Sequence, residues 1–297
     1  MKKLLFIFNP WSGKRQVKEH LFEITDAFTK AGYLVTVYPT QKSQDCYEYV
    51  KDNATAFDMI VCSGGDGTLN ETVAGVINNG STDIPIGYIP SGSTNDFATS
   101  LMIPKTINKA VENIINGSEY LCDVGIFNGR YFNYVAAFGL FTDISYATPQ
   151  QLKNILGHQA YLLESVKSFA NSKTYEIKVK TDDFEMEDRF IYGMVANSKS
   201  VGGIKGITGK EIHLDDGLFE AILIKAPKNP LEMQSLFSGF ILQENNNMVK
   251  HVKCKEITFE SKELIPWVLD GEYGGEHTEV KIQVENKKVK YFIAKHP

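Results

Sequence analysis

The sequence FDMIVCSGGDGTLNETVAGVINN, residues 57–79, decides the fold of the first half of the chain. Its apolar start predicts a buried strand over 57–62, a glycine-rich turn follows, and residues 68–79 have helical periodicity. The surrounding sequence repeats this alternation, with strands expected at 2–8, 34–38 and 84–89 and helices at 15–31, 44–53 and 107–116. Regular alternation of strands and helices predicts a parallel, Rossmann-like sheet with helices on both faces.

The expected helices also have residues that are typical of helix ends. Ser43 and Thr106 stand where an N-cap hydroxyl is favoured, before the helices at 44–53 and 107–116. Gly32 and Gly117 follow two helical patterns and are predicted to end them.

The second half of the chain has a different pattern. Asn128-Gly129 lies between apolar residues and is a strong hairpin signal. Further strands are expected at 174–181, 188–197, 217–225, 256–260, 265–270, 278–284 and 288–294, and helical inserts at 151–171 and 230–244. This pattern predicts an antiparallel β-sandwich. We therefore expect two domains, 1–122 and 123–297, and leave open whether the last strand, about 288–297, rejoins the first.

The composition limits the class of protein. The 297 residues carry a net charge of −5, 43% are hydrophobic and 23% are charged, as in a globular protein. No apolar run reaches the roughly 18–20 residues that span a bilayer, and the first apolar run is too short for a secretory signal. Four scattered cysteines fit a reducing compartment. The negative charge argues against nucleic acid as a partner, and we expect a cytoplasmic protein.

Three loops of the first half follow expected strands, at 9–14, 63–70 and 90–96. Ligands of parallel sheets bind at the carboxyl ends of the strands, so these loops are expected to converge on one ligand. In the second loop Gly64, Gly65 and Gly67 lack Cβ atoms, which lets backbone N–H groups approach an anion, and the following helix adds its N-terminal donors. Asp66 would repel that anion unless a cation lay between them, which implies Mg²⁺.

These motifs, together with the late Leu-Asp-Gly-Glu at 269–272, resemble the diacylglycerol kinase catalytic-domain family. The resemblance extends over essentially the whole chain and includes the domain order. Sphingosine and ceramide kinases share the motifs, and NAD kinases share Gly-Gly-Asp-Gly more distantly. The resemblance implies an active site in the cleft between the two domains, with Asp66 and Glu272 as its catalytic carboxylates.

The resemblance also assigns the nucleotide site. ATP would contact the following residues: Asn9, Pro10, Trp11, Ser12, Gly13, Thr40, Gly64, Gly65, Asp66, Gly67, Thr68, Leu69, Asn70 and Thr94.

Glu272 corresponds to the family's general base, which takes the proton of the acceptor hydroxyl. An ordinary glutamate pKa of about 4.3 lies about 11–12 units below that of an alcohol near 16, so full deprotonation before attack would cost roughly 16 kcal/mol. The residue must therefore act late, as the new P–O bond forms.

The family also binds a structural Mg²⁺ in the second domain. Carried over, its ligands are the Asp216 carboxylate and the backbone carbonyls of His213 and Leu218.

The expected function is transfer of the ATP γ-phosphate to a hydroxyl of a membrane lipid, with diacylglycerol as the expected acceptor and phosphatidic acid as the product. The apolar stripes of 151–171 and 230–244 either cover the sandwich core or form a lipid entrance, with peripheral and reversible membrane contact. Two alternatives stay open: a kinase of a soluble alcohol such as NAD, and a nucleotide-regulated lipid-binding protein without catalysis. A homodimer is also left open.

Overall fold

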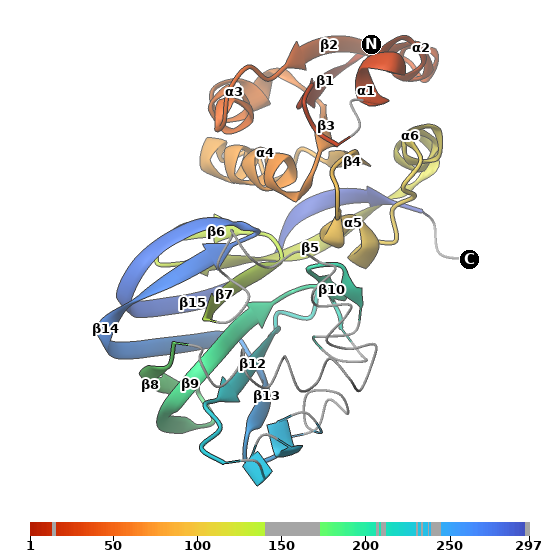
Figure 1. Cartoon of the computed structure of the whole chain (residues 1–297). Helices are drawn as coiled ribbons and strands as arrows, with labels where there is room; N and C mark the ends of the chain where they lie inside the picture. Colours follow the sequence, from red (N-terminus) through yellow and green to blue (C-terminus); the bar gives the residue numbers. More distant parts are fainter. Residues whose placement is uncertain are drawn as a thin grey trace. The chain divides into compact units, whose positions relative to one another are not determined.

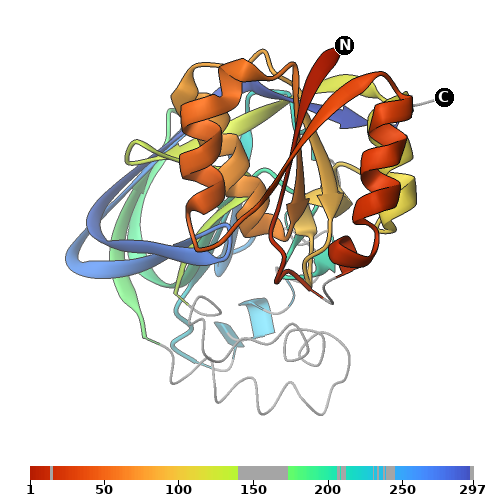
Figure 2. The same cartoon turned by 90° about the horizontal axis from the view of Figure 1, so that it is seen from above.

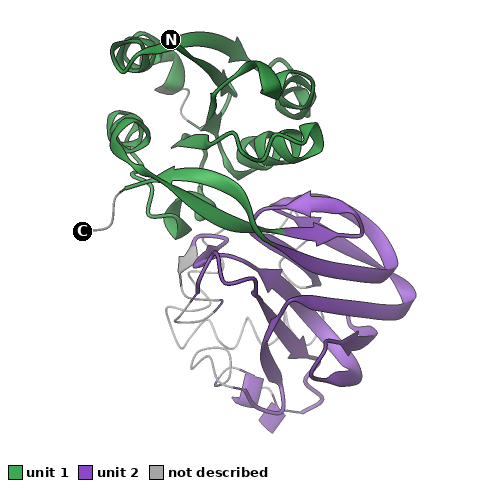
Figure 3. Cartoon of the chain, turned by 180° about the vertical axis from the view of Figure 1, so that it is seen from behind, with its two compact units in different colours: residues 1–124, 286–297 green, residues 125–285 purple. Residues whose placement is uncertain are grey.

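The computed structural model describes residues 1–13, 16–139, 173–205, 208, 212–229, 231–232, 234–236, 238 and 245–294. The chain divides into two compact units (Figure 3): unit 1 comprises residues 1–124 and 286–297, and unit 2 comprises residues 125–285. The helical insert predicted at 151–171, and most of the one at 230–244, lie outside the described residues.

Unit 1 is built on a parallel sheet. Its strands are β1 (Lys2–Phe8), β2 (Tyr33–Pro39), β3 (Met59–Gly64), β4 (Ile86–Pro90) and the last part of β15 (Glu272–Ile293). The order is β2-β1-β3-β4-β15, and all four pairings are parallel. Tyr291 pairs with Ile86, so the end of the chain joins the sheet of unit 1 (Figure 1).

Helices cover this sheet on both faces. The helices of unit 1 are α1 (Gln16–Glu19), α2 (Leu21–Lys30), α3 (Asp45–Asn53), η1 (Ala54–Ala56), α4 (Asp66–Asn79), α5 (Asp96–Ser100) and α6 (Ile107–Asn116). Helices α3 and α4 lie on one face, and α2 and α6 lie on the other (Figure 2). Every residue of β3 and β4 is buried as a result, which explains the continuous apolar runs in their sequences.

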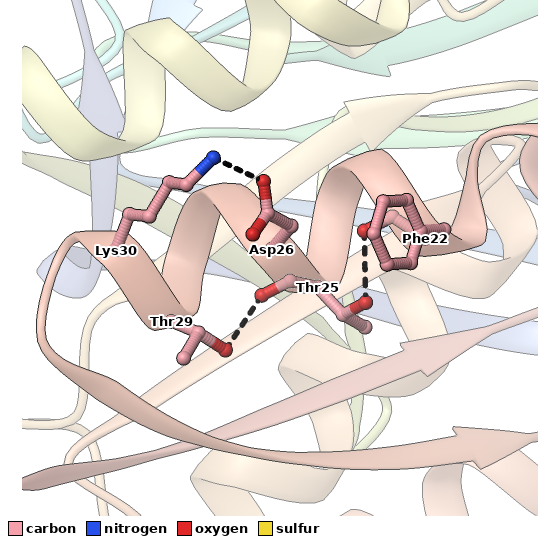
Figure 4. A network of polar contacts seen from close by, with 5 residues as sticks. All are labelled: Phe22, Thr25, Asp26, Thr29 and Lys30. Atoms are coloured by element: carbon pink, nitrogen blue, oxygen red, sulfur yellow. Dashed lines mark hydrogen bonds and ion pairs between the residues drawn. The ribbon is translucent and has the colours of Figure 1, made fainter.

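Helix α2 has the amphipathic pattern that its sequence predicts. Ile24 and Phe28 are buried on one side. On the exposed side the Thr25 and Thr29 hydroxyls donate to backbone carbonyls of the preceding turn, and Lys30 Nζ lies 2.6 Å from Asp26 Oδ2 (Figure 4). The single helix predicted over 15–31 is nevertheless wrong, because α1 and α2 are separate elements on either side of His20.

The predicted helix ends are only partly right. Gly32 has the left-handed φ of +91° that ends α2 as predicted. Helix α3 is preceded not by a Ser43 cap but by Gln44 with φ +64°, and neither Gln44 nor Thr106 forms a side-chain cap hydrogen bond. Gly117 ends α6 as predicted, but with φ −74°, in an extended rather than a left-handed conformation.

Unit 2 is antiparallel. Beyond the end of β5 (Ser118–Phe127) it contains β6 (Arg130–Phe132), β7 (Val135–Gly139), β8 (Tyr175–Lys180), β9 (Glu185–Ala196), β10 (Ser200–Val201), β11 (Ile204–Lys205), β12 (Phe219–Lys225), β13 (Val249–Cys254), β14 (Glu256–Leu269) and most of β15. Strands β7, β9, β8 and β14 pair in a closed ring. The ring encloses an aromatic core around the fully buried Trp267, and closure leaves these strands no free edge inside the ring.

Two long strands, β14 and β15, differ from the sequence-based expectation. The strands expected at 256–260 and 265–270 are one strand, β14, with a register shift between them, and those expected at 278–284 and 288–294 both belong to β15. The break expected between 278–284 and 288–294 is absent, because Asn286 and Lys287 lie inside β15 and both donate hydrogen bonds to the buried Asp123 carboxylate. The Asn128-Gly129 turn is present, with φ +46° and +85°.

None of the helices in the described ranges combines the length and apolar character that crossing a bilayer requires.

Candidate functional site

The parallel register of unit 1 brings three loops to one edge of its sheet. Phe8 at the end of β1 lies beside Pro39 of β2 and Ser63 of β3, and Gly64 lies beside Pro90 of β4. The loops that start at residues 9, 65 and 91, and Thr40 after β2, therefore leave the sheet at neighbouring positions.

The loops touch each other through their glycines. A Cβ atom on Gly13 would lie 2.1 Å from the Ser91 carbonyl oxygen, and one on Gly92 would lie 2.4 Å from the Gly65 Cα. The backbone N–H groups of Ser91 and Gly92 both donate to the Gly64 carbonyl, at 2.8 and 3.1 Å. The first and third loops thus each pack against a neighbouring loop at backbone distance, which only residues without a Cβ allow.

Gly64 and Gly65 lead into the first turn of α4. A Cβ on Gly64 would lie 2.2 Å from the Thr68 hydroxyl, so Thr68 packs against the bare backbone there. Gly65 is the N-cap of α4 and is extended. The N-terminus of this 14-residue helix, which carries a partial positive charge, therefore lies directly behind the glycine turn.

Asp66 is held by the backbone of a different helix. Its Oδ2 accepts a hydrogen bond from Asp96 N at 3.1 Å, and its Oδ1 accepts one from Phe97 N at 3.2 Å. Burial raises the pKa of Asp66, the Phe97 N–H lowers it, and the nearby Asp96 carboxylate raises it further. The carboxylate therefore caps α5, so a cation is not needed to explain its position, although each oxygen retains a lone pair for one.

The other predicted nucleotide contacts fall into two groups. Asn9, Ser12, Gly13, Gly65, Asp66, Gly67 and Thr94 are at least partly accessible, and Trp11 is 62% exposed, with Lys18 Nζ 4.6 Å from the centre of its ring. Pro10, Thr40, Gly64, Thr68, Leu69 and Asn70 are buried. The Leu69 side chain is fully buried, so only its backbone is available to a phosphate.

The predicted residues of unit 2 lie along one end of its sheet, which we call the rim. Strands β9 and β14 end there, and β7, β12 and β15 begin there, in the order β12-β9-β7-β14-β15. The register fixes this alignment: Glu220 pairs with Ala196, Ala196 with Val135, Ala136 with Leu269, and Leu269 with Glu272. Glu272 and the 213–218 loop before β12 thus belong to the same rim, four strands apart.

Glu272 is the first residue of β15 and follows a two-residue turn. Asp270 and Gly271 have φ values of +51° and +86°, as a type I′ turn requires. The Glu272 side chain is 38% exposed, and Arg130 Nη2 lies 3.9 Å from its Oε2. Arg130 Nη1 also donates to the Tyr273 carbonyl at 3.3 Å. A cation from the β5–β6 hairpin therefore stands beside the predicted base.

Asp270 fastens that turn to β7. Its buried carboxylate accepts three backbone hydrogen bonds, from Asn133 N at 2.7 Å and from Tyr134 N and Val135 N at 3.0 Å each. Its own N–H donates to the Val135 carbonyl. Three N–H donors are a strong site for a buried carboxylate, and they fix the position from which Glu272 extends.

The predicted Mg²⁺ ligands lie in the loop before β12. His213 and Asp216 are exposed and Leu218 is half-buried. Asp216 Oδ1 accepts the Leu218 N–H at 3.0 Å, so the carboxylate folds over its own turn. Within the described ranges no group of three or more His, Cys, Asp or Glu side chains is arranged to hold a metal ion. One carboxylate with backbone carbonyls and water is still a donor set that Mg²⁺ accepts.

Three residues at the rim were not identified from the sequence. The hairpin signal at Asn128-Gly129 does not single out Arg130, and Asp270 enters only as part of the Leu-Asp-Gly-Glu motif at 269–272. Asn133, whose backbone N–H donates to the Asp270 carboxylate, belongs to none of the motifs found in the sequence. Only Asp270 could have been found from the sequence, because an Asp before Gly at the end of a strand often accepts backbone hydrogen bonds in a turn.

Comparison with protein families agrees with this arrangement. Residues 3–126 match the diacylglycerol kinase catalytic domain, and residues 143–291 match the YegS C-terminal NAD kinase beta sandwich-like domain.

Curated relatives match over nearly the whole chain. The diacylglycerol kinase of Bacillus subtilis (strain 168) is 33% identical over 281 residues, 93% of this chain and 91% of the relative. That of Staphylococcus carnosus (strain TM300) is 32% identical over 93% of this chain and 90% of the relative.

Solved structures show the same fold. A crystal structure from Bacillus anthracis str. Sterne, described as a candidate diacylglycerol kinase, has a TM-score of 0.79 at 26% identity and covers 98% of this chain and 97% of that one. With two matching domain models and curated relatives above 30% identity along its length, the chain belongs to the diacylglycerol kinase family.

Proposed function

We propose that this protein transfers the γ-phosphate of ATP to the free hydroxyl of diacylglycerol, giving phosphatidic acid and ADP. The observation that carries the proposal is the loop cluster of unit 1, where glycines of three loops meet in front of the α4 N-terminus. The relatives named diacylglycerol kinase supply the acceptor.

The triphosphate is proposed to lie against Gly13, Gly65 and Gly67, with the ends of β1 and β2 beside it. Backbone N–H groups and the α4 N-terminus offer fixed donors to its oxygens. Asp66 and the phosphates together form an oxygen donor set that fits Mg²⁺, which would neutralise charge on the transferred phosphoryl group.

Glu272 is proposed to accept the proton of the lipid hydroxyl. The hydroxyl oxygen forms the new bond to phosphorus, the bond to the β-phosphate oxygen breaks, and ADP leaves. Because phosphoryl transfer depends mainly on positioning and charge neutralisation, Glu272 needs to contribute only the 10²–10⁴-fold that is typical of a general base. Arg130 and the Asp270 hydrogen bonds hold it in place meanwhile.

Asp216 and the carbonyls of His213 and Leu218 stay the predicted ligands of a structural Mg²⁺. The active site in a cleft between the domains, the cytoplasmic location and reversible contact with a membrane likewise stay predictions from the sequence, as does the homodimer.

The function is tested by giving the protein γ-labelled ATP and Mg²⁺ with a total lipid extract, with NAD, or with neither. Label in a chloroform-soluble product that comigrates with phosphatidic acid is the expected result. Label in NAD would support a soluble-alcohol kinase, and no transfer would support a lipid-binding protein without catalysis.

A further inference from the structure

Asn133 has a buried side-chain amide that forms no hydrogen bond with any residue that the structure describes. The residue is 1% exposed, and neither its Oδ1 nor its Nδ2 has a hydrogen-bond partner in the structure as described. An amide can accept two hydrogen bonds and donate two. Buried polar groups of native proteins are nearly always partnered, by protein, water or ligand, because leaving one unpaired is costly.

The position of Asn133 indicates what partner it serves. The backbone N–H of Asn133 donates a hydrogen bond to Asp270 Oδ2. Asp270 lies two residues before Glu272 in the sequence. Asn133 directly precedes Tyr134 and β7, the middle strand of the rim, two strands from β15 and two from β12. At about 4.8 Å per strand, Glu272 starts roughly 10 Å along the rim from it, within reach of one small molecule.

We propose that the Asn133 amide binds the acceptor alcohol, and this rests on the proposed function. The shared chemistry is an oxygen that both donates and accepts. In diacylglycerol, the one free hydroxyl would donate to Asn133 Oδ1, and the neighbouring ester carbonyl would accept from Asn133 Nδ2. A hydrogen bond to an amide in a buried environment is stronger than one in water.

A water molecule could also donate to and accept from the Asn133 amide. A permanently bound internal water would make Asn133 part of the folded structure, whereas an acceptor-binding amide stays unpaired until the lipid arrives. Since neither polar atom is open to solvent, the alcohol has to displace the groups that cover them. The two sources predict opposite effects of removing the amide on stability.

The test uses Asn133→Leu, which keeps the size of the side chain but removes its polar atoms. The control is Asn113→Leu, in α6 of unit 1, where another buried asparagine also has an unpartnered Oδ1 but donates from Nδ2 to the Phe292 carbonyl. Each full-length variant is melted without ATP, with and without dioctanoylglycerol. The KM values for dioctanoylglycerol and for ATP are then measured separately.

Asn133→Leu is expected to have an unchanged or higher Tm without ligand, to lose the stabilisation by dioctanoylglycerol, and to raise the KM for dioctanoylglycerol roughly 10- to 100-fold with the KM for ATP unchanged. The control should keep both responses to the lipid. A lower Tm for Asn133→Leu, with stabilisation by lipid retained, would identify a structural water and overturn the proposal. Wild-type protein that gains no stability from dioctanoylglycerol would overturn it too.

The melting arm needs no catalysis. If the wild type transfers no phosphate but is stabilised by dioctanoylglycerol through Asn133, the kinase assignment fails while this inference stands.

Discussion

Asp270 carries three backbone hydrogen bonds on one buried carboxylate, although the sequence around it reads as an ordinary hairpin turn. A turn residue of this kind does more than reverse the chain, because it ties the end of β14 to the start of β7. The position of Glu272 therefore depends on a neighbour that has no chemical part in the reaction.

Asp270→Asn should lower the free energy of unfolding by about 2–4 kcal/mol, since the amide loses the charge and turns one NH₂ group toward backbone donors. Turnover should fall at the same time, with ATP binding unchanged. Urea unfolding and ATP titration measure the two effects. Asp182→Asn, at the exposed turn between β8 and β9, is the control and should change stability by less than about 0.5 kcal/mol. Equal stability of Asp270→Asn and wild type would show that the three hydrogen bonds to the Asp270 carboxylate do not stabilise the fold.

Asp66 has a structural role that complicates its mutation. Replacement by alanine would leave two N–H groups of α5 unpaired, so a loss of activity could reflect loss of structure. Asp66→Asn keeps one acceptor oxygen and therefore one of the two cap hydrogen bonds. It should lose Mg²⁺-dependent turnover if the carboxylate binds the cation. Activity is measured across a Mg²⁺ titration, with Tm followed in parallel. A Mg²⁺ dependence like that of wild type would mean that Asp66 serves only to cap α5.

At the scale of elements, the glycine loops make an asymmetric contact that can be tested from both sides. A Cβ on Gly92 would lie 2.4 Å from the Gly65 Cα, whereas a Cβ on Gly65 would lie 3.4 Å from the Gly92 Cα, an ordinary contact distance. Gly92→Ala should therefore destabilise unit 1, by about 1–3 kcal/mol, because backbone must move.

Gly65→Ala should leave Tm nearly unchanged but weaken ATP binding, because its methyl group would stand where a phosphate approaches the backbone. Thermal melting and ATP titration of the two variants separate the effects. Undiminished ATP affinity in Gly65→Ala would remove the glycine turn from the nucleotide site.

Local patterns predicted most elements of unit 1, because its buried strands and amphipathic helices carry strong periodic signals. They failed where a distant residue decides the structure. Helix α5 was missed because its N-terminus is capped by Asp66, thirty residues earlier. The separation of the strands expected at 278–284 and 288–294 was wrong because the buried Asp123 holds Asn286 and Lys287 inside one strand.

The candidate site divides in the same way. The glycine loops and the Asp-Gly-Glu turn could be predicted from the sequence, because each depends on glycine at particular positions. Arg130 and Asn133 were not, because their importance comes from neighbours that only the strand register of unit 2 places beside them.

At the scale of the molecule, buried thiols should make the fold sensitive to alkali. Burial raises the pKa of Cys62 and of Cys254 from 9.0 to about 12. Between these values the thiols are ionised in the unfolded chain but protonated in the folded one. The unfolded state thus binds fewer protons, and stability should fall as the pH rises from about 9 to 12, by about 1.4 kcal/mol per pH unit for each thiol.

Urea unfolding at pH 8, 9 and 10 measures this slope. Cys62→Ala should lower stability at pH 8 by leaving a small cavity, yet should show a shallower decline with pH than wild type. Identical slopes for the two proteins would mean that Cys62 ionises in the folded state as well.

The most direct test of the account is the turnover of Glu272→Gln with ATP, Mg²⁺ and diacylglycerol. The variant is nearly isosteric but cannot take the proton, so kcat should fall on the order of 10²–10⁴-fold while ATP binding and Tm stay those of wild type. Glu276→Gln, an exposed glutamate of the same strand, should retain full activity. Full turnover in Glu272→Gln would contradict the role of this carboxylate and, with it, the mechanism proposed for the molecule.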